Sequence, residues 1–244
     1  MTPAWDAPWL APLATRVVER LGLHFPAERW PDLLRGVTAA ARASGAHDVD
    51  DFAQRLLGAA PDAAPLHALA EALTVGETYF FREPRSFEVL ADEILPPLID
   101  ARRAGSRQLR LWSAGCCTGE EAYSLAIMLD RLLPDLDDWQ VTILATDVNR
   151  RFLQKAARAE YGEWSFRDAP PWLKSRYFTA GRRGHALAPR IRRMVRFAAL
   201  NLVDLRFPLK GDTAAMDVIL CRNVLMYFPP PTASRRVARG GVLR

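Results

Sequence analysis

The sequence predicts an α/β fold, in which a doubly wound and mostly parallel sheet follows a small all-helical N-terminal domain. Three observations support this prediction. Residues 11–73 carry apolar residues only at helical spacing, strand-like runs alternate with helical patterns after Thr74, and one basic stretch interrupts that alternation. Strands that alternate with helices form parallel sheets. We therefore expect domains at residues 1–75 and 76–244, with an inserted small β subdomain at about 174–197.

Four short helices account for the N-terminal domain. The first presents Leu13, Val17 and Leu21 on one face and ends at Gly22, a residue type that commonly terminates helices. The third begins in an acidic run at residues 48–51, where the helix dipole favours negative charge. The second and fourth contain Trp30 to Val37 and Pro65 to Leu73.

The remainder is expected to alternate between strands and helices. A first helix over 84–103 is disturbed by Pro96-Pro97, because proline lacks the backbone N–H. Strands are expected at 109–112, 141–145, 194–202 and 217–220, helices at 118–133 and 150–159, and an antiparallel ribbon around 181–184. One short helix follows the prolines at 229–231, so the C-terminal strands of such a sheet are expected to be missing and the fourth strand to form an edge.

Composition excludes several classes of protein. Of the 244 residues, 50% are hydrophobic and 25% charged, which allows a sizeable core and argues against disorder and collagen. No apolar run approaches the roughly 20 residues that cross a bilayer. The N-terminus lacks the pattern of a secretory signal, and the three cysteines form neither a disulfide framework nor a metal-ligand spacing. A soluble cytoplasmic protein without membrane insertion or metal is expected.

The net charge of +5 is unevenly distributed. Residues 169–203 contain eight lysines and arginines and no acidic residue, whereas residues 1–75 contain more acidic residues than arginines. The basic stretch indicates either an acidic partner or a solvated surface, and charge pattern alone does not separate the two.

A strand, a loop of small residues and a helix follow one another over residues 111–121. Gly115 and Gly119 are expected to let a ligand approach the backbone closely. The loop lacks the G-x-G-x-x-G pattern, and two acidic residues directly after Gly119 would repel a pyrophosphate but attract an ammonium group. Cys116 and Cys117 have no histidine nearby in the sequence, so we interpret them as small residues in a turn.

Asp147 ends the second expected strand. A carboxylate at this place can accept hydrogen bonds from both hydroxyls of a ribose, although it could equally cap the helix that begins near Arg150. The loop and this carboxylate together indicate a nucleoside without phosphates but with an amino-acid end. S-adenosylmethionine fits both requirements.

Five motifs, in order along nearly the whole chain, resemble the CheR family of S-adenosylmethionine-dependent methyltransferases. They are the runs 75–82 and 112–125, Ala145-Thr146-Asp147, Asn201-Leu202, and the run 221–228. Members of this family esterify glutamates on bacterial chemoreceptors. The resemblance implies a methyltransferase sheet, S-adenosylmethionine as cofactor, S-adenosylhomocysteine as product, and the cytoplasmic helices of chemoreceptors as partners.

The resemblance also implies roles for individual residues. Arg82 would be the catalytic-site cation, and Tyr227 would lie at the active-site end of the fourth strand. The implied cofactor-binding residues are Thr78 and Arg82, Ala114 and Glu120 at the methionine part with Glu120 facing the ammonium, Asp147 at the ribose, Asn201 and Leu202 at the adenine, and Asn223. The alternatives are a structural ion pair of Arg82 with Glu77 or Glu83, and a core role for Tyr227.

The implied chemistry agrees with these residue types. A glutamate side chain is ionised at neutral pH because its pKa is about 4.3, so its methylation needs no general base. An arginine can orient a carboxylate through two parallel hydrogen bonds, which makes Arg82 the candidate for that task. Tyr227 could donate a hydrogen bond from its phenol or shape the path of the methyl group.

Other functions are weighed on the same motifs. The run 222–225 lacks the Asn/Asp-Pro-Pro-aromatic turn of adenine-N6 methyltransferases, and the chain has no Pro-Cys pair as in cytosine-C5 enzymes, so nucleic acid is disfavoured. The short loop of the inserted subdomain argues against tethering by a receptor's C-terminal peptide, a form of strand addition. A non-catalytic or truncated module that binds cofactor or receptor is the rival from another class.

Overall fold

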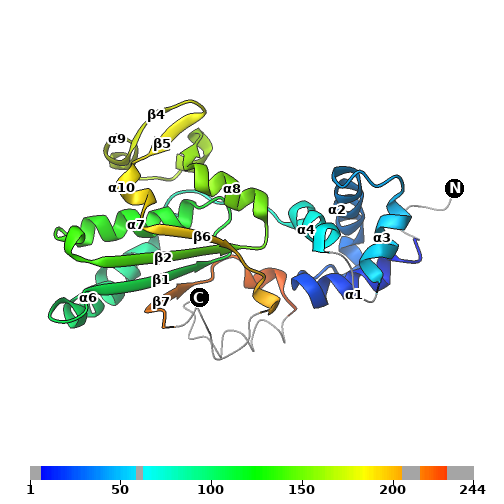
Figure 1. Ribbon diagram of the computed structural model, residues 1–244, viewed down its shortest axis with the longest axis horizontal. Coiled ribbons are helices and arrows are strands. Elements are labelled where there is room, and N and C mark those ends of the chain that lie inside the picture. The colour runs from blue at the N-terminus through cyan, green and yellow to red at the C-terminus, as the bar shows by residue number, and fades with distance from the viewer. Residues whose placement is uncertain (1–6, 59–62, 205–214, 230–244) are drawn as a thin grey trace.

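The protein is described by a computed structural model over residues 7–58, 63–204 and 215–229. A parallel sheet forms its centre, a group of helices from the N-terminal part lies beyond the carboxyl ends of the strands, and a small antiparallel sheet lies on another side (Figure 1). The helix expected after Pro231 falls outside the described residues. Within them, no helix is long and apolar enough to cross a membrane.

The four helices expected in the N-terminal part are present. They are α1 (Leu10–Leu21), α2 (Trp30–Ala43), α3 (Val49–Leu57) and α4 (Ala63–Leu73), with a 3-10 turn, η2 (Ala27–Arg29), before α2. Their apolar faces form a hydrophobic cluster of their own around Leu13, Leu33 and Phe52. Gly22 ends α1 in the left-handed conformation, with φ of 75°, and its N–H donates to the carbonyl of Val18. The boundaries 1–75 and 76–244 remain a prediction.

The helix expected over 84–103 is divided into three parts. An α-helix, α5 (Pro84–Val89), continues as a π-helical turn, η3 (Leu90–Ile94), and then as α6 (Leu95–Arg103). Pro96 and Pro97 lie in the first turn of α6. A proline ring clashes with the carbonyl four residues earlier, so the irregular turn directly precedes the two prolines, as the sequence predicts.

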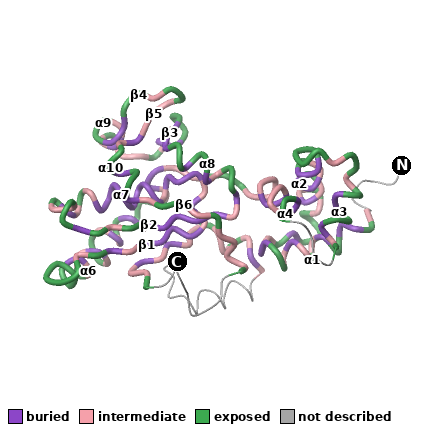
Figure 2. The backbone as a smooth tube through the Cα atoms, viewed as in Figure 1, coloured by how far each residue is buried: buried purple, intermediate pink, exposed green. Residues whose placement is uncertain are grey.

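The central sheet has four parallel strands in the order β6-β2-β1-β7. They are β1 (Gln108–Ala114), β2 (Gln140–Asp147), β6 (Val195–Ala199) and β7 (Val218–Leu220), connected in part by α7 (Glu120–Leu132), η4 (Leu136–Asp138) and α8 (Arg150–Arg158). Buried residues run along β1, β2 and α7 (Figure 2). The predicted α/β fold is confirmed. The strand order reverses at β1, and in such sheets a crevice opens at the carboxyl ends beside the reversal.

A second sheet of three strands forms the inserted β structure. Its order is β3-β5-β4, and every pair is antiparallel. The elements are β3 (Glu160–Tyr161), η5 (Glu163–Phe166), α9 (Trp172–Tyr177), β4 (Phe178–Gly181), β5 (Gly184–Leu187) and α10 (Pro189–Arg192). The predicted ribbon is present as β4 and β5. The sequence did not indicate β3, because two residues are too few to show a strand pattern and only their pairing with β5 defines them.

Candidate active site

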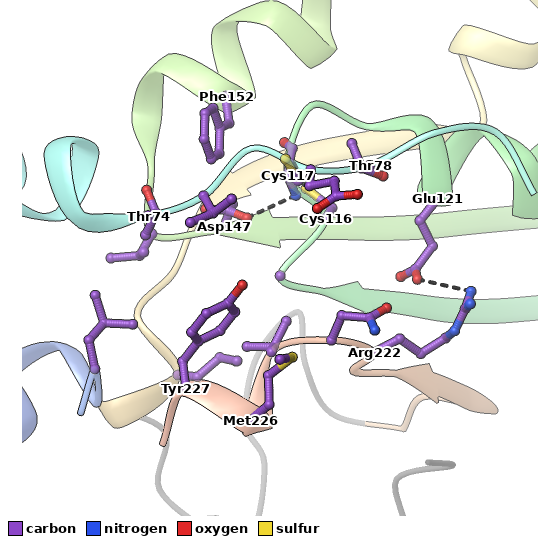
Figure 3. A pocket seen from close by; sticks show the side chains of 18 of the residues that line it. Thr74, Thr78, Cys116, Cys117, Glu121, Asp147, Phe152, Arg222, Met226 and Tyr227 are labelled. Atoms are coloured by element: carbon purple, nitrogen blue, oxygen red, sulfur yellow. Dashed lines mark hydrogen bonds and ion pairs between the residues drawn. The ribbon is translucent and has the colours of Figure 1, made fainter. Parts of the chain in front are cut away.

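A cavity of about 240 Å³ opens at the carboxyl ends of the four parallel strands. Its wall includes the loop after β1, the end of β2, η6 (Leu202–Asp204) after β6, and η8 (Leu225–Tyr227) after β7. The cavity and several of its side chains are shown in Figure 3. Seven of the site residues expected from the sequence line it, namely Thr78, Arg82, Asp147, Asn201, Leu202, Asn223 and Tyr227.

Asp147 lies at the edge of this cavity, where both of its carboxylate oxygens are held by backbone groups. The N–H of Cys117 donates to Oδ2 at 2.8 Å, and the N–H of Asn149 donates to Oδ1 at 2.8 Å. Burial raises the pKa of this carboxyl, and the two backbone donors act against that rise. Asn149, and not Asp147, caps α8, because its side chain accepts from the first N–H groups of the helix. Asp147 is therefore left to face the cavity.

The two acidic residues at the start of α7 point in different directions. Glu120 is buried away from the cavity, where it accepts hydrogen bonds from Thr118 Oγ1 at 2.6 Å and Ser165 Oγ at 2.8 Å. Glu121 lines the cavity, accepts from Ser113 Oγ at 2.7 Å, and pairs with Arg222 at 3.4 Å. Successive helix residues are about 100° apart, which is why the two side chains leave the helix in different directions. Of the two, Glu121 and not Glu120 lines the cavity, and which of them faces the ammonium stays a prediction.

Burial is the main cause that raises the pKa of Glu120 above 4.5. The folded protein then binds more protons at this site than the unfolded chain does, so the contribution of Glu120 to the free energy of unfolding falls as pH rises above about 4.5. We expect Glu120→Gln to remove this component of the pH dependence. Urea unfolding at several pH values would measure it, and an unchanged slope would contradict the assignment.

Ala114 also differs from its expected place. It is the last residue of β1, and its side chain packs in a buried cluster with Trp112 and Leu144. Side chains along a strand alternate between the two faces of the sheet, so Ala114 shares the face of Trp112. It does not line the cavity, which Gly115 and the two following cysteines reach instead.

The glycines of this loop are required by contacts within the protein. Both have positive φ, 85° for Gly115 and 94° for Gly119. A Cβ on Gly115 would lie 2.3 Å from a methyl of Val224, and one on Gly119 would lie 2.8 Å from Cβ of Ala156. The expectation that both glycines serve ligand approach is thus corrected for Gly119, which allows α7 to pack against α8.

The three cysteines have no role as nucleophiles in this arrangement. Burial raises the pKa of Cys117 and of Cys221 to about 12, and holds that of Cys116 well above its ordinary value. The reactive form of cysteine is the thiolate, which these environments suppress near neutral pH. For Cys116 and Cys117, this agrees with their interpretation as small residues in a turn.

Arg82 lies at one side of the cavity, in a strained segment. Its Nη1 donates to the carbonyl of Glu77 at 2.6 Å, and the residues on either side of it, Phe81 and Glu83, have φ of 57° and 58°. Such values are costly for residues other than glycine and are common at functional sites. The carboxylate of Glu77 pairs with Arg167. The ion pair of Arg82 with Glu77, weighed as an alternative from the sequence, is therefore not what holds this side chain.

A second arginine of the cavity was missed by the sequence reasoning. The side chain of Arg222, only 6% exposed, pairs with Glu83 at 3.1 Å as well as with Glu121, and donates to the carbonyl of Arg82. Asn223 also donates to Glu83, at 3.0 Å, and this bond is the largest cause that lowers the pKa of Glu83. Arg222 belongs to the run 221–228, but nothing in a single sequence shows that its guanidinium turns inward.

Tyr227 extends from η8 toward the middle of the cavity, with its hydroxyl at the tip (Figure 3). The next residue, Phe228, is buried. The core role weighed for Tyr227 thus belongs to its neighbour. The sequence places both aromatic residues at the end of the fourth strand, but only the turn of the backbone decides which of them faces the cavity.

The fold and the site together indicate which class of ligand-binding protein this is. The cavity lies where a parallel α/β sheet reverses its order. Two carboxylates, Asp147 and Glu121, line it, and arginines lie at one side. Such crevices bind nucleotides and nucleosides. Carboxylates in place of phosphate-binding backbone amides favour a nucleoside that carries a cationic group over a nucleotide.

Comparison with known proteins identifies the family. Residues 76–239 match the model of the CheR methyltransferase, SAM binding domain. The chain belongs to the CheR methyltransferase family. The resemblance stated from the five motifs is confirmed, and the matched domain is named for S-adenosylmethionine, the cofactor expected from the loop and Asp147.

Three curated relatives are similar to much of the chain. A probable chemotaxis protein methyltransferase of Rhizobium etli is 36% identical over 72% of this chain, and a probable biofilm formation methyltransferase, WspC, of Pseudomonas aeruginosa is 37% identical over 89%. Chemotaxis protein methyltransferase 2 of Vibrio cholerae is 38% identical over 67%. The chain spans 66%, 50% and 56% of the lengths of these three relatives, respectively.

Proposed function

We propose that this protein transfers a methyl group from S-adenosylmethionine to glutamate side chains of chemoreceptors, which gives glutamate methyl esters and S-adenosylhomocysteine. One observation carries the proposal. One cavity at the carboxyl ends of the parallel strands is lined by two carboxylates, Asp147 and Glu121, and by the candidate catalytic pair, Arg82 and Tyr227. Membership of the CheR family supports the same reaction.

The residues of the cavity suit the proposed cofactor. Asp147 would accept hydrogen bonds from ribose hydroxyls, since each of its oxygens keeps a lone pair beside its backbone donor. Glu121 would face the ammonium group in place of Glu120. Apolar side chains that suit the flat adenine also line the cavity, among them Phe152, Leu200 and Leu202. Thr78 and Asn223 complete the proposed cofactor contacts.

The proposed mechanism asks little proton chemistry of the protein. When bound, S-adenosylmethionine supplies an electrophilic methyl group. Arg82 would hold the acceptor carboxylate and direct one of its oxygens, because a guanidinium binds a carboxylate in two places. The Tyr227 hydroxyl would give a further donor beside it. Displacement of water from the acceptor carboxylate when the substrate binds would leave its oxygen free to attack.

We propose cytoplasmic helices of chemoreceptors as the partners, which places the protein in the cytoplasm. Part of the basic stretch at 169–203 is already neutralised by acidic neighbours, since Lys174 pairs with Glu163 and Arg190 with Asp130. The turn of the inserted ribbon consists of two arginines, Arg182 and Arg183, between β4 and β5. This short turn supports docking by charge over tethering through a receptor's C-terminal peptide.

The direct test is transfer of radiolabelled methyl from S-adenosylmethionine to membranes that contain chemoreceptors, with membranes without receptors as the control. Label that base releases as methanol would support glutamate esters. Calorimetric binding of S-adenosylhomocysteine without any such label would favour the non-catalytic module. Label stable to acid and base in RNA or DNA would contradict the proposed acceptor and support a nucleic-acid enzyme.

Asp147→Ala is expected to weaken the binding of S-adenosylhomocysteine by about 1–3 kcal/mol, the cost of leaving hydrogen-bonding groups of the ligand without their acceptor. Asp147→Asn keeps the shape and one acceptor oxygen, so it should lose less. Calorimetry measures the affinity of both variants. Thermal unfolding measures the stability that is lost with the hydrogen bonds to Cys117 and Asn149. Equal affinity of the wild type and Asp147→Ala would remove the ribose role.

A further inference from the structure

The end of helix α1 forms part of the wall of the cavity. Leu21, the last residue of α1, and Leu23, just after it, line the cavity beside residues of the sheet, although about 200 residues of chain separate them from Tyr227. Figure 1 shows α1 beside the segment that follows β7. The N-terminal helices therefore contribute directly to the candidate active site.

Two contacts join the end of α1 to the turn that carries Tyr227. The N–H of His24 donates to the carbonyl of Tyr227 at 2.8 Å. The ring of Phe228 lies against the bare backbone of Gly22, so closely that a Cβ there would be 2.4 Å from Cε1 of the ring. Phe228 is only 7% exposed, and the end of α1 is what it rests on. The end of α1 thus holds the turn through a backbone hydrogen bond and through the packing of one side chain.

A third contact joins the same helix end to the loop after β6. Asn201 Nδ2 donates to the carbonyl of Arg20 at 2.6 Å, while Oδ1 accepts from the N–H of Val203. The side-chain amide of Asn201 is thus committed to α1, although the residue was expected at the adenine. Through this bond, the end of α1 connects two separate parts of the cavity wall.

Among the described residues, the turn has few other contacts that could set its position, apart from Val224 near its start, which lies against the bare backbone of Gly115. Its own hydrogen bonds are local, from Tyr227 N–H to the carbonyl of Val224 and from Phe228 N–H to that of Leu225. Met226, between them, is 72% exposed. At its start, the turn is held by the bond from Asn223 to Glu83. Its far end depends on α1.

We propose that the end of α1 positions the catalytic turn, with Gly22 as the seat for Phe228 and His24 as the backbone donor to Tyr227. The catalytic role of Tyr227 in this proposal rests on the proposed function, whereas the contacts between the end of α1 and the turn do not depend on it. Gly22 and Phe228 are positioning residues, since they act through Tyr227. Because a misplacement of about 1 Å can cost about 100-fold in rate, loosening this seat should lower turnover strongly.

Gly22→Ala tests the seat, and Gly45→Ala is its matched control. Both glycines follow the end of an N-terminal helix, α1 or α2, and have positive φ, 75° and 67°, so both variants carry similar backbone strain. A Cβ on Gly45 would meet nothing within 4 Å, whereas one on Gly22 would collide with Phe228. The difference between the two variants therefore isolates the contact with Phe228.

Three measurements on the full chain follow. Hydrogen exchange over residues 222–229 should be faster in Gly22→Ala than in Gly45→Ala. The turnover number for receptor methylation should fall by about ten- to 100-fold in Gly22→Ala alone. Phe228→Ala should release the turn by itself. In the Phe228→Ala background, Gly22→Ala should therefore lower the turnover number no more than Gly45→Ala does. This lack of additivity would not arise from a general loss of stability.

Equal exchange over 222–229 and equal turnover in the two glycine variants would overturn the proposal. If Gly22→Ala does not fold, Phe228→Ala decides, because the amide of His24 should then exchange faster than in the wild type, and unchanged protection of that amide would overturn it. If the wild type transfers no methyl at all, the proposed function fails, while the exchange measurements still test the seat.

Discussion

Replacing Arg82 by alanine is expected to lower methyl transfer by about 100- to 1,000-fold, the range seen when one preorganised donor is removed from an active site. The guanidinium lines the cavity, and two of the nearby carboxylates form ion pairs with other arginines, Glu77 with Arg167 and Glu83 with Arg222. Removing it leaves the acceptor carboxylate without its orienting partner. Binding of S-adenosylhomocysteine, measured by calorimetry, should stay close to that of the wild type.

Two variants make this result specific. Arg82→Lys keeps the charge but loses the two-point geometry, so its transfer rate should lie between those of the wild type and the alanine variant. Arg85→Ala removes a neighbouring arginine that pairs with Glu88 and does not line the cavity, and it should transfer at nearly the normal rate. Unchanged turnover of Arg82→Ala would remove Arg82 from the mechanism.

Glu121→Gln is expected to weaken the binding of S-adenosylhomocysteine by about ten- to 100-fold, because a hydrogen bond to a charged group contributes about 1.5–3 kcal/mol. Glu120→Gln is the matched control. It changes the adjacent carboxylate in the same way, but that carboxylate is buried against Thr118 and Ser165. Its affinity for the ligand should therefore remain near that of the wild type, as measured in the same calorimetric titrations.

The pair of variants also separates the two assignments. If Glu120→Gln loses affinity and Glu121→Gln does not, the ammonium lies at Glu120, and the assignment of the ammonium to Glu121 is wrong. Glu121→Gln has a second consequence, since Arg222 loses one of its two carboxylate partners. Double substitution of Glu121 and Arg222 would show this coupling as a departure from additivity.

Much of the fold follows from local signals. Gly22 ends α1, the two prolines of α6 disturb the turn before them, and the runs that become β1 and β2 are short and apolar between turn residues. Each of these features depends on a residue and its close neighbours in the chain. The strand β3 could not be expected on this basis, because it exists through its pairing with β5.

The candidate site was predictable to the level of the motif but not of each side chain. Asp147 ends a strand, and the carboxyl ends of parallel strands lie at the same edge of the sheet, so its position follows from the sequence. The choice between Glu120 and Glu121 depends on the rotation of α7 about its axis. That helix is buried on nearly all sides, so no polar face reveals its orientation in the sequence.

The sequence by itself determined the parallel α/β fold, the family, the cofactor that the loop and Asp147 call for, and the candidacy of Arg82 and Tyr227. These depend on residue types and spacings that a single chain displays. Tertiary structure alone decided that Glu121 faces the cavity, that Gly119 serves helix packing, that Arg222 turns inward, and that α1 closes the wall. Each of these is a contact between distant segments, and packing, which sets such contacts, has no local signature.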